Sequence, residues 1–219
     1  MLNYNNRIAR RWNNLIRELF LLPRMRRRLK NKDVTILANN CNGGFIYHDL
    51  GLRFCSPTIN MFFYNDHFFA FLEDLDYYLG QELRLAEHPL YTGIEKDYPI
   101  CELGEGKKRI ELHFLHYDSF EDAKNCWDKR KARMNKDNMF AIFSFFDIAD
   151  EEWLKRFDRI PIKNKVAFIE RPLPQYKYAF YIKGYEKTGL GLLNEYENLW
   201  GCRKYDQFDY VNWFNSNEK

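Results

Sequence analysis

Hydrophobic residues along the chain fall into two patterns, short continuous runs and longer stretches with helical spacing. The continuous runs are rich in Val, Ile, Leu and Phe, which is typical of strands buried on both faces of a sheet. They occupy Val34–Ala38, Met139–Phe146, Lys165–Ile169 and Tyr178–Ile182. The composition of a further apolar run, Ile59–Tyr64, also permits a strand.

Helical spacing and capping residues lie between these runs. Ser119-Phe120-Glu121-Asp122 has the form of a capping box and predicts a helix that continues to about Met134. Asp150–Phe157 and Phe208–Phe214 predict two further helices. Phe45–Leu50 predicts a short helix that follows the first strand after a loop.

One pair of apolar runs predicts a β-hairpin, because Tyr98–Leu103 and Arg109–Leu115 flank a turn that contains glycine. Together the elements predict an α/β fold, a three-layer α/β/α arrangement with a mixed, mostly parallel sheet that contains this one antiparallel hairpin. No repeat or low-complexity linker divides residues 33–219. We therefore expect one α/β domain, residues 33–219, preceded by an N-terminal arm, residues 1–32.

Composition supports a folded intracellular protein. Hydrophobic residues make up 46% of the chain and aromatic residues 18%, which excludes wholesale disorder. The five cysteines are scattered and none forms a C-x-x-C pair, a pattern of reduced thiols rather than of disulfides or a zinc site. No signal peptide or membrane-spanning run is recognisable, so the expected location is the cytoplasm.

The positive charge is concentrated in the arm. Residues 1–32 hold eight Arg, two Lys and one Glu, whereas the remaining residues are net acidic. The arm also carries an apolar stripe at helical spacing, made of Ile8, Trp12, Leu15, Ile16, Leu19 and Phe20. Residues 1–30 could therefore lie on an anionic membrane surface at the inner face of the membrane, or form a helix that packs on the domain. The acidic remainder disfavours nucleic acid as a partner.

The loop between the first strand and the first helix is the leading candidate site. Asn39, Asn40 and Cys41 follow the strand, and Gly43 and Gly44 would permit positive φ angles and close backbone approach. Ligands of open α/β sheets bind at the carboxyl ends of strands, where helix N-termini attract anions. The loop is predicted to hold a polar or phosphate group. The alternative is a tight turn whose asparagines bond the local backbone.

Hydroxyl and thiol groups near this loop offer nucleophiles. Cys41 would be one if the helix terminus lowered its pKa, and an inert buried thiol otherwise. Ser56 and Thr58 flank Pro57 and could line the same pocket or form a turn.

A second concentration of chemistry is His113-Phe114-Leu115-His116-Tyr117-Asp118 at the end of the hairpin. His113 or His116 could act as a general base that Asp118 orients. Structural histidines at a corner are the alternative. No metal site is predicted, because the two histidines point to opposite faces of a continuing strand.

Two arginines follow on the capped helix. Arg130 shares a face with core residues, so it requires an anion or must reach the surface. Arg130 and Arg133 are predicted to clamp a phosphate or carboxylate. An internal partner, Asp118, Asp147 or Glu111, is the alternative.

Blocks of sequence in a fixed order resemble a bacterial domain-of-unknown-function family, number 1919, often described as exopolysaccharide or capsule biosynthesis proteins. The blocks are Val34-Thr-Ile-Leu-Ala-Asn-Asn-Cys-Asn-Gly-Gly-Phe-Ile-Tyr, Leu50-Gly-Leu, Ser56-Pro-Thr-Ile, His113-Phe-Leu-His-Tyr, Trp127-Asp-Lys-Arg, Arg133-Met-Asn and Asn164-Lys-Val. The resemblance runs from residue 32 to the C-terminus and leaves the arm outside. It implies a three-layer α/β fold and a setting in surface polysaccharide synthesis, with no established catalytic residues.

These observations lead to three functional hypotheses. The first is a transferase acting on an activated sugar, such as a nucleotide sugar, or on a lipid-linked glycan intermediate. The second is a non-catalytic binding or assembly protein of the polysaccharide machinery. The third is acyl transfer through Cys41 or Ser56.

Asp66 is predicted to cap a helix that carries Phe69, Leu72, Leu75 and Leu79 at core spacing. No cofactor is indicated, and Asp74-Leu-Asp76 lies in this predicted helix, which weakens a metal-bound nucleotide-sugar site.

Overall fold

Four parallel strands form the central sheet of the computed structural model, which describes residues 3–90, 98–186 and 188–217. Their order is β1-β5-β6-β7, and every neighbouring pair is parallel. The strands are β1 (Thr35–Ala38), β5 (Met139–Ser144), β6 (Asn164–Ile169) and β7 (Ala179–Tyr181). All four predicted runs are therefore strands of one sheet, and each ends within two residues of its expected position.

Helices cover both faces of this sheet because its side chains alternate between two apolar cores. Ile36 and Ile142 face a core shared with α2, α3 and α8, whereas Leu37 and Phe143 face a core shared with α4 to α7. The three-layer α/β arrangement is confirmed. The helices are α1 (Arg7–Ile16), α2 (Leu22–Arg28), α3 (Asn42–Leu50), α4 (Asn65–Glu73), α5 (Leu75–Gly80), α6 (Phe120–Lys131), α7 (Glu151–Asp158) and α8 (Tyr210–Asn215).

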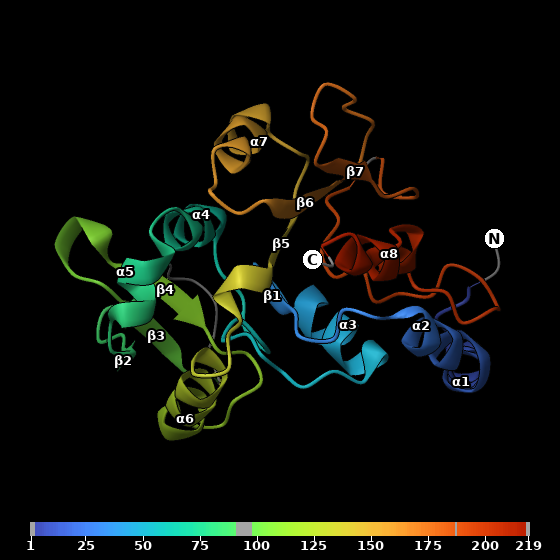
Figure 1. Ribbon diagram of the computed structural model, residues 1–219, viewed down its shortest axis with the longest axis horizontal. Coiled ribbons are helices and arrows are strands. Elements are labelled where there is room, and N and C mark those ends of the chain that lie inside the picture. Colours follow the sequence, from blue (N-terminus) through green and yellow to red (C-terminus); the bar gives the residue numbers. More distant parts are fainter. Residues whose placement is uncertain (1–2, 91–97, 187, 218–219) are drawn as a thin grey trace.

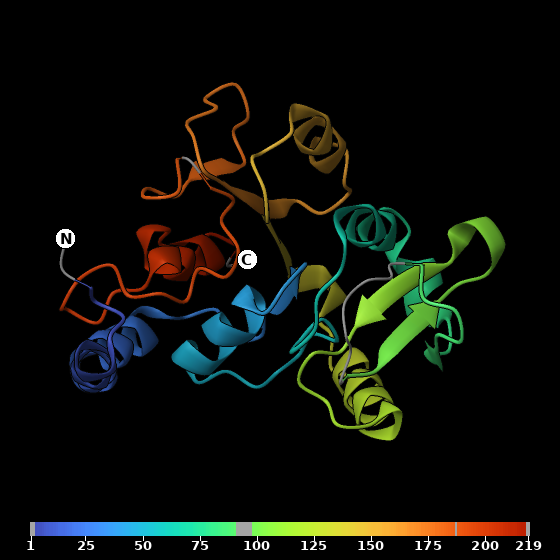
Figure 2. The same cartoon turned by 180° about the vertical axis from the view of Figure 1, so that it is seen from behind.

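The predicted hairpin forms, but in a sheet of its own. Strands β3 (Ile100–Leu103) and β4 (Ile110–His113) pair antiparallel, and β2 (Arg84–Leu85) adds a third strand. This second sheet lies to one side of the parallel sheet (Figure 2). It does not extend the parallel sheet through β1, because hydroxyl groups already occupy the outer edge of that strand. The N–H of Ile36 donates to the hydroxyl of Tyr47, and the N–H of Ala38 donates to Thr58 Oγ1.

The expectation of a strand at Ile59–Tyr64 is wrong. This segment runs between the two sheets and makes a single antiparallel bridge, from Phe62 to His113. A second backbone bond joins Phe63 N–H to the carbonyl of Asn39 at 2.9 Å. The apolar side chains of the segment serve as a link between the sheets rather than as part of a ladder.

Helix α3 begins earlier than predicted and includes both glycines of the Asn/Gly loop. Neither Gly43 nor Gly44 has a positive φ, so that expectation is wrong. The glycine at 43 is needed for close approach: a Cβ there would lie 3.0 Å from the Cβ of Ala38 and 3.3 Å from Ile36 Cγ2. Gly43 thus lets the first turn of α3 pack directly on β1.

The N-terminal arm packs on the domain through a buried arginine. Helices α1 and α2 are joined by a π-helical turn, Arg17–Leu21, and Arg17 is only 1% exposed. Its guanidinium pairs with Asp49 at the end of α3 and with Asp206, each at 2.5 Å. Burial alone would lower the pKa of Arg17, but the hydrogen bond and charge of Asp206, with Asp49, raise it above its usual value. These ion pairs fix the orientation of the arm relative to the α/β domain.

Gly43→Val should destabilise the fold by about 1–3 kcal/mol, because the added side chain overlaps two buried residues of β1. Gly80→Val is the control, since nothing lies within 4 Å of a Cβ at Gly80. Urea denaturation of both variants measures the difference. Equal midpoints would show that α3 does not depend on the close contact.

Arg17→Met should cost about 3–5 kcal/mol, because it removes the closest cation of the buried Asp49 carboxylate and of the largely buried Asp206 carboxylate. Arg28→Met removes the exposed pair with Asp209 and should cost at most about 1 kcal/mol. Thermal unfolding of the two variants tests the contrast. A loss for Arg17→Met no larger than that for Arg28→Met would contradict the assignment of Arg17 as the anchor of the arm.

Candidate functional site

A cleft of about 850 Å³ opens at the carboxyl ends of β1 and β5. These two strands are neighbours, but the helices that follow them lie on opposite faces of the sheet. Helix α3 packs in one core and α7 in the other. A crevice forms where connections from adjacent parallel strands diverge in this way, and ligands of α/β proteins bind there.

Asn39 holds the two strands together at the base of the cleft without lining it. Its side-chain amide donates to the carbonyl of Ser144 and its Oδ1 accepts the N–H of Ser144, both at 2.9 Å. Asn39 is fully buried. Asn39 was predicted to bind a ligand, but its role in the structure is to join β1 to β5 beyond the last hydrogen bond of the ladder.

Asn40 lines the cleft and carries an unsatisfied donor. Its Oδ1 accepts the N–H of Asn42 at 3.0 Å, which caps the first turn of α3. Its side-chain nitrogen is buried and has no hydrogen-bond partner among the described residues. A buried amide left unpaired costs about 1–3 kcal/mol, so an acceptor that entered the cleft would relieve that cost.

A glycine-containing segment crosses the carboxyl ends of the strands and forms one wall of the cleft through Leu192. A Cβ at Gly189 would overlap the carbonyl oxygen of Phe146. Leu190 N–H bonds to the carbonyl of Phe145 at 3.0 Å, and Leu193 N–H bonds to Asn42 Oδ1 at 3.2 Å. The segment thus fixes β5 and α3 relative to one another.

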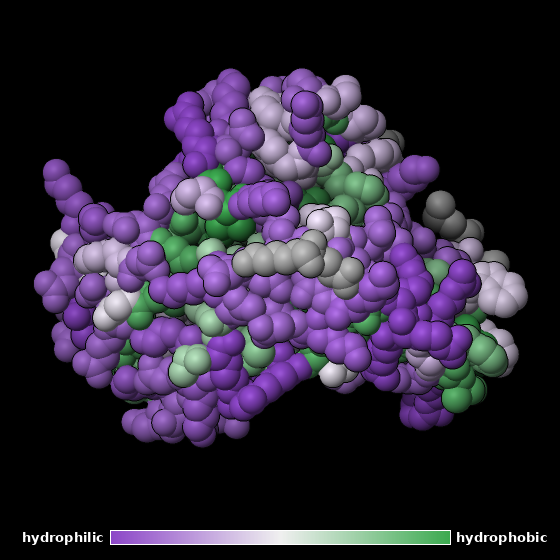
Figure 3. Space-filling view, viewed as in Figure 1, coloured by the Kyte–Doolittle hydropathy of each residue, from purple (hydrophilic) through white to green (hydrophobic). Residues whose placement is uncertain are grey.

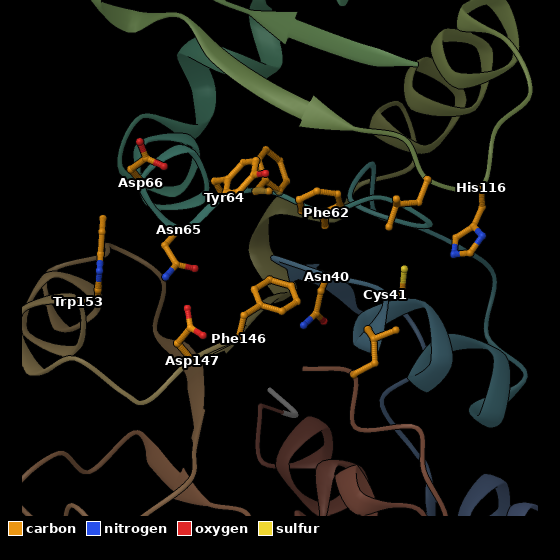
Figure 4. Close-up of a pocket in the computed structure, with 13 residues that line it drawn as sticks. Asn40, Cys41, Phe62, Tyr64, Asn65, Asp66, His116, Phe146, Asp147 and Trp153 are labelled. Atoms are coloured by element: carbon orange, nitrogen blue, oxygen red, sulfur yellow. The ribbon is translucent and has the colours of Figure 1, made fainter. Parts of the chain in front are cut away.

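Aromatic side chains supply most of the remaining wall. Phe62 and Tyr64 face Phe146 across the cleft, and Trp153 of α7 lies at one end (Figure 4). Trp153 stacks on Phe69 with ring centroids 5.1 Å apart, so its ring is held in place by the core. The cleft therefore offers flat apolar faces of fixed orientation.

The polar groups of the cleft are divided between its two ends. Asn65, Asp66 and Asp147 gather at the end near Trp153 (Figure 4). Cys41 and His116 lie at the other end. Cys41 is the N-cap residue of α3, so this second end also contains the positive end of a helix dipole.

The structure separates the three residues predicted to be catalytic. His116 is exposed and lines the cleft. His113 is fully buried, stacks on Phe62 with centroids 4.5 Å apart, and lies 3.8 Å from the carboxylate of Glu111. Asp118 is exposed and is not part of the cleft lining. Of the three, only His116 is in position to meet a ligand there.

The hydroxyl and guanidinium groups expected near the loop lie elsewhere. Ser56 and Thr58 are fully buried and bond to each other at 3.1 Å, beside β1. Arg130 donates to the carbonyl of Ile59 and to the hydroxyl of Tyr117. Its internal partners are thus different from the carboxylates considered from sequence.

Arg133 is half-buried on the same side as Arg130 and does not line the cleft either. Among the described residues that line the cleft there is no lysine or arginine. The predicted arginine clamp therefore does not meet the Asn/Gly loop.

Burial raises the pKa of the Cys41 thiol from 9.0 to about 11. The thiol is therefore protonated at neutral pH despite its place at a helix N-terminus, since desolvation is the dominant effect. Cys41 thus contributes to the lining of the cleft and is not an activated nucleophile.

Several cleft residues were not identified from the sequence. Asp66 was interpreted only as a helix cap, Asp147 only as a possible partner of Arg130, and Phe146 and Trp153 only as strand and helix residues. The signal that could have found Asp147 is its place directly after β5, which is equivalent to the place of the Asn/Gly loop after β1.

The part of the chain that the structure describes contains no cluster of three or more His, Cys, Asp or Glu side chains able to hold a metal ion. Within the same ranges, no helix combines the length and apolar character that crossing a bilayer requires.

Comparison with known proteins finds one family. The model of "Domain of unknown function (DUF1919)" matches residues 13–215. A Haemophilus influenzae protein described as uncharacterized is 39% identical over 201 residues, which cover 91% of this chain and 93% of that protein. The match begins inside the arm, so the expectation that the arm lies outside the shared region is wrong for residues 13–32.

Alkylation of Cys41 by iodoacetamide should be about 100-fold slower at pH 7.5 than alkylation of the same cysteine in the denatured chain, because a pKa of about 11 instead of 9.0 leaves about 100-fold less thiolate. The rate should rise about tenfold per pH unit up to at least pH 9.5. Mass spectrometry of the Cys41 peptide measures both. A plateau below pH 8 would contradict the raised pKa and restore Cys41 as a nucleophile.

Proposed function

The chain belongs to the DUF1919 family, and we propose that it is a transferase that holds a sugar in the cleft between β1 and β5 during the synthesis of a surface polysaccharide. The substrate class is an activated sugar or a lipid-linked glycan intermediate. The resemblance of the sequence to exopolysaccharide and capsule proteins supports this setting. The chemistry of the cleft supports the sugar.

The observation that carries the proposal is an aromatic-walled cleft with a buried, unpaired amide donor at its base. Sugar rings combine apolar C–H faces with a rim of hydroxyl groups. Phe62, Phe146 and Trp153 offer flat surfaces to such faces. Asn40 offers its free N–H to a hydroxyl or ring oxygen.

The end of the cleft near Trp153 fits the acceptor sugar. Asp66, Asp147 and Asn65 supply carboxylate and amide oxygens that accept hydrogen bonds from hydroxyl groups. The described lining contains no lysine or arginine, and Arg156, which lies over the Trp153 ring, is paired with Glu73, so a phosphate is disfavoured at this end. A neutral, hydroxyl-rich group is the better match.

The opposite end fits the reacting groups. His116 supplies a base, and the amino end of α3 supplies partial positive charge for an anionic leaving group. In the proposed step the acceptor hydroxyl oxygen bonds to the electrophilic atom of the donor, His116 takes the hydroxyl proton, and the leaving group departs with the electrons of the broken bond. Glycosyl donors fit this scheme. Acyl transfer through Cys41 or Ser56 is disfavoured by their burial.

The proposed location is the cytoplasmic side of the membrane, as a peripheral protein. Sugar donors and lipid-linked acceptors would meet there. The basic arm is the part of the chain whose composition favours this location.

A non-catalytic binding or assembly protein is the second candidate. The observation in its favour is that no side chain within the described ranges hydrogen-bonds to His116, whereas a catalytic base is usually oriented by such a partner. A binding protein would use the same aromatic walls without the base.

Sugar binding tests the proposal first. Saturation-transfer NMR with a panel of monosaccharides and their nucleotide diphosphates should find a ligand, and Phe146→Ala and Asp147→Asn should each weaken its binding by about tenfold or more. Ile148→Ala and Asp118→Asn are matched controls, since both residues are exposed and neither lines the cleft. Unchanged binding in the two cleft variants would place the ligand elsewhere.

Catalysis is tested separately with His116. In cells that lack the gene, His116→Ala should restore less than about 1% of the polysaccharide that the wild-type chain restores, consistent with loss of a general base. Its sugar binding should be retained. His48→Ala is the control, because His48 is 72% exposed by its side chain and lies at the far end of α3. Full restoration by His116→Ala would reject the enzyme and favour the binding protein.

A further inference from the structure

Five of the six residues of the apolar stripe on the N-terminal arm are exposed, and the sixth, Ile16, is half-buried. Ile8, Trp12, Leu15, Leu19 and Phe20 are each between 51% and 81% exposed. The first four lie at spacings of three and four residues along α1 and the π-helical turn, and Phe20 directly follows Leu19. Figure 3 shows hydrophobic surface at the lower right, over the position of α1 in Figure 1. A helix that packs on a domain normally buries such a stripe, and here it does not.

The opposite, polar side of the same helix is the buried one. Asn13 is fully buried, and its Oδ1 accepts the N–H of Gly201 at 3.1 Å. Arg17 is held by Asp49 and Asp206 in the ion-pair cluster. Gly201 has φ +74, and a Cβ there would lie 2.8 Å from the backbone nitrogen of Arg17. Because these contacts hold the polar side of α1 against the domain, the apolar side faces away from it.

A second apolar element lies beside the stripe. Leu199 and Trp200 are exposed, Trp200 by 76%. The indole N–H of Trp12 donates to the carbonyl of Leu199 at 3.0 Å, so this loop is fixed to α1. The exposed surface is therefore made of two segments that are about 180 residues apart in sequence. We call the seven residues the apolar face, namely Ile8, Trp12, Leu15, Leu19, Phe20, Leu199 and Trp200.

Cations are concentrated in the same arm that carries most of this apolar face. Residues 1–32 hold ten basic residues and one acidic residue, Glu18. Arg24 and Arg27 are exposed, and neither donates a hydrogen bond within the described part of the chain. Apolar side chains with aromatic residues among them, on a segment rich in arginine, match the acyl boundary and the anionic head groups of a bilayer.

We propose that the apolar face is a membrane-docking surface that inserts into the interface of an anionic lipid bilayer. The inference deepens the peripheral location in the proposed function and rests on that function only for the choice of membrane side. A second copy of the chain fits less well, because a symmetric contact through this surface would bring two clusters of arginines together. Opposite charge favours lipid.

Docking through this surface also relates the membrane to the cleft. Asp49 and its neighbours at the carboxyl end of α3 hold the arm: Arg17 pairs with the Asp49 carboxylate and Arg26 donates to the Asp49 carbonyl at 2.8 Å. The amino end of the same helix forms the base of the cleft. Nine helical residues span about 13 Å, so a single short helix separates the attachment point of the arm from the cleft.

Sedimentation with vesicles tests the docking surface. The full chain should bind vesicles of phosphatidylcholine with 30% phosphatidylglycerol and should bind pure phosphatidylcholine at least tenfold more weakly. Leu15→Asn with Leu19→Asn should reduce binding to the anionic vesicles by about 30-fold, as expected when two exposed side chains no longer enter the interface. Leu85→Asn with Ile148→Asn, equally exposed but outside the apolar face, should bind as the wild type does.

The charge contribution has its own pair of variants. Arg24→Ala with Arg27→Ala should weaken binding to anionic vesicles by about 30-fold, since each arginine near the surface contributes about 1 kcal/mol, or roughly fivefold. Lys163→Ala with Lys177→Ala removes the same charge from exposed positions of the domain and should have no effect.

Three results would overturn the proposal. They are equal binding to neutral and anionic vesicles, unchanged binding of the Leu15 and Leu19 variant, and a wild-type dimer that this variant dissociates without any vesicle binding. A failure of the proposed sugar-binding function can be told apart from a failure of membrane docking. Phe146→Ala should sediment with vesicles as the wild type does, and sugar binding is measured without lipid.

Discussion

The close contact of α3 with β1 is the constraint on which both candidate surfaces depend. Gly43 is the residue that permits it, because a side chain there would lie against Ala38 and Ile36 of the strand. The position of α3 determines where the residues at both of its ends lie. The amino end presents Asn40 to the cleft, and the carboxyl end presents Asp49 to the buried arginine of the arm. One helix of nine residues therefore connects the candidate cleft to the proposed lipid-docking surface.

The two surfaces use apolar side chains for different purposes. In the cleft, aromatic rings such as Trp153 are held by core contacts and face an enclosed space that contains polar groups. On the apolar face, Trp12 and Trp200 are 52% and 76% exposed, and the arm that carries Trp12 is rich in arginine. Fixed rings around an unpaired donor suit recognition of one molecule. Exposed rings with an arginine-rich segment suit a fluid, anionic surface.

Local patterns predicted the strands of the parallel sheet, the hairpin, most helices and the place of the cleft, because these follow from burial, capping and the rule that ligands bind at the carboxyl ends of parallel strands. Cys41 was found by that rule, and His116 by its place at the end of the hairpin. The role of Arg130 was not predictable, because its partners, a carbonyl and a phenol, come from loops whose path no local pattern gives. The orientation of the arm was also not predictable from the sequence. Amphipathicity shows that α1 has a polar and an apolar face, but the buried ion pair of Arg17 determines that the polar face packs on the domain.

The central claim is that a ligand completes the hydrogen bonding of Asn40 in the cleft. The most direct measurement follows the side-chain NH₂ signals of Asn40 and Asn138 by ¹⁵N NMR during a sugar titration. Asn138 is the internal reference, because its amide nitrogen already donates to Asn31 at 2.8 Å, away from the cleft. The account predicts that the Asn40 signals shift and exchange more slowly with solvent while those of Asn138 stay unchanged. Saturating sugar binding that leaves the Asn40 signals unmoved would contradict it.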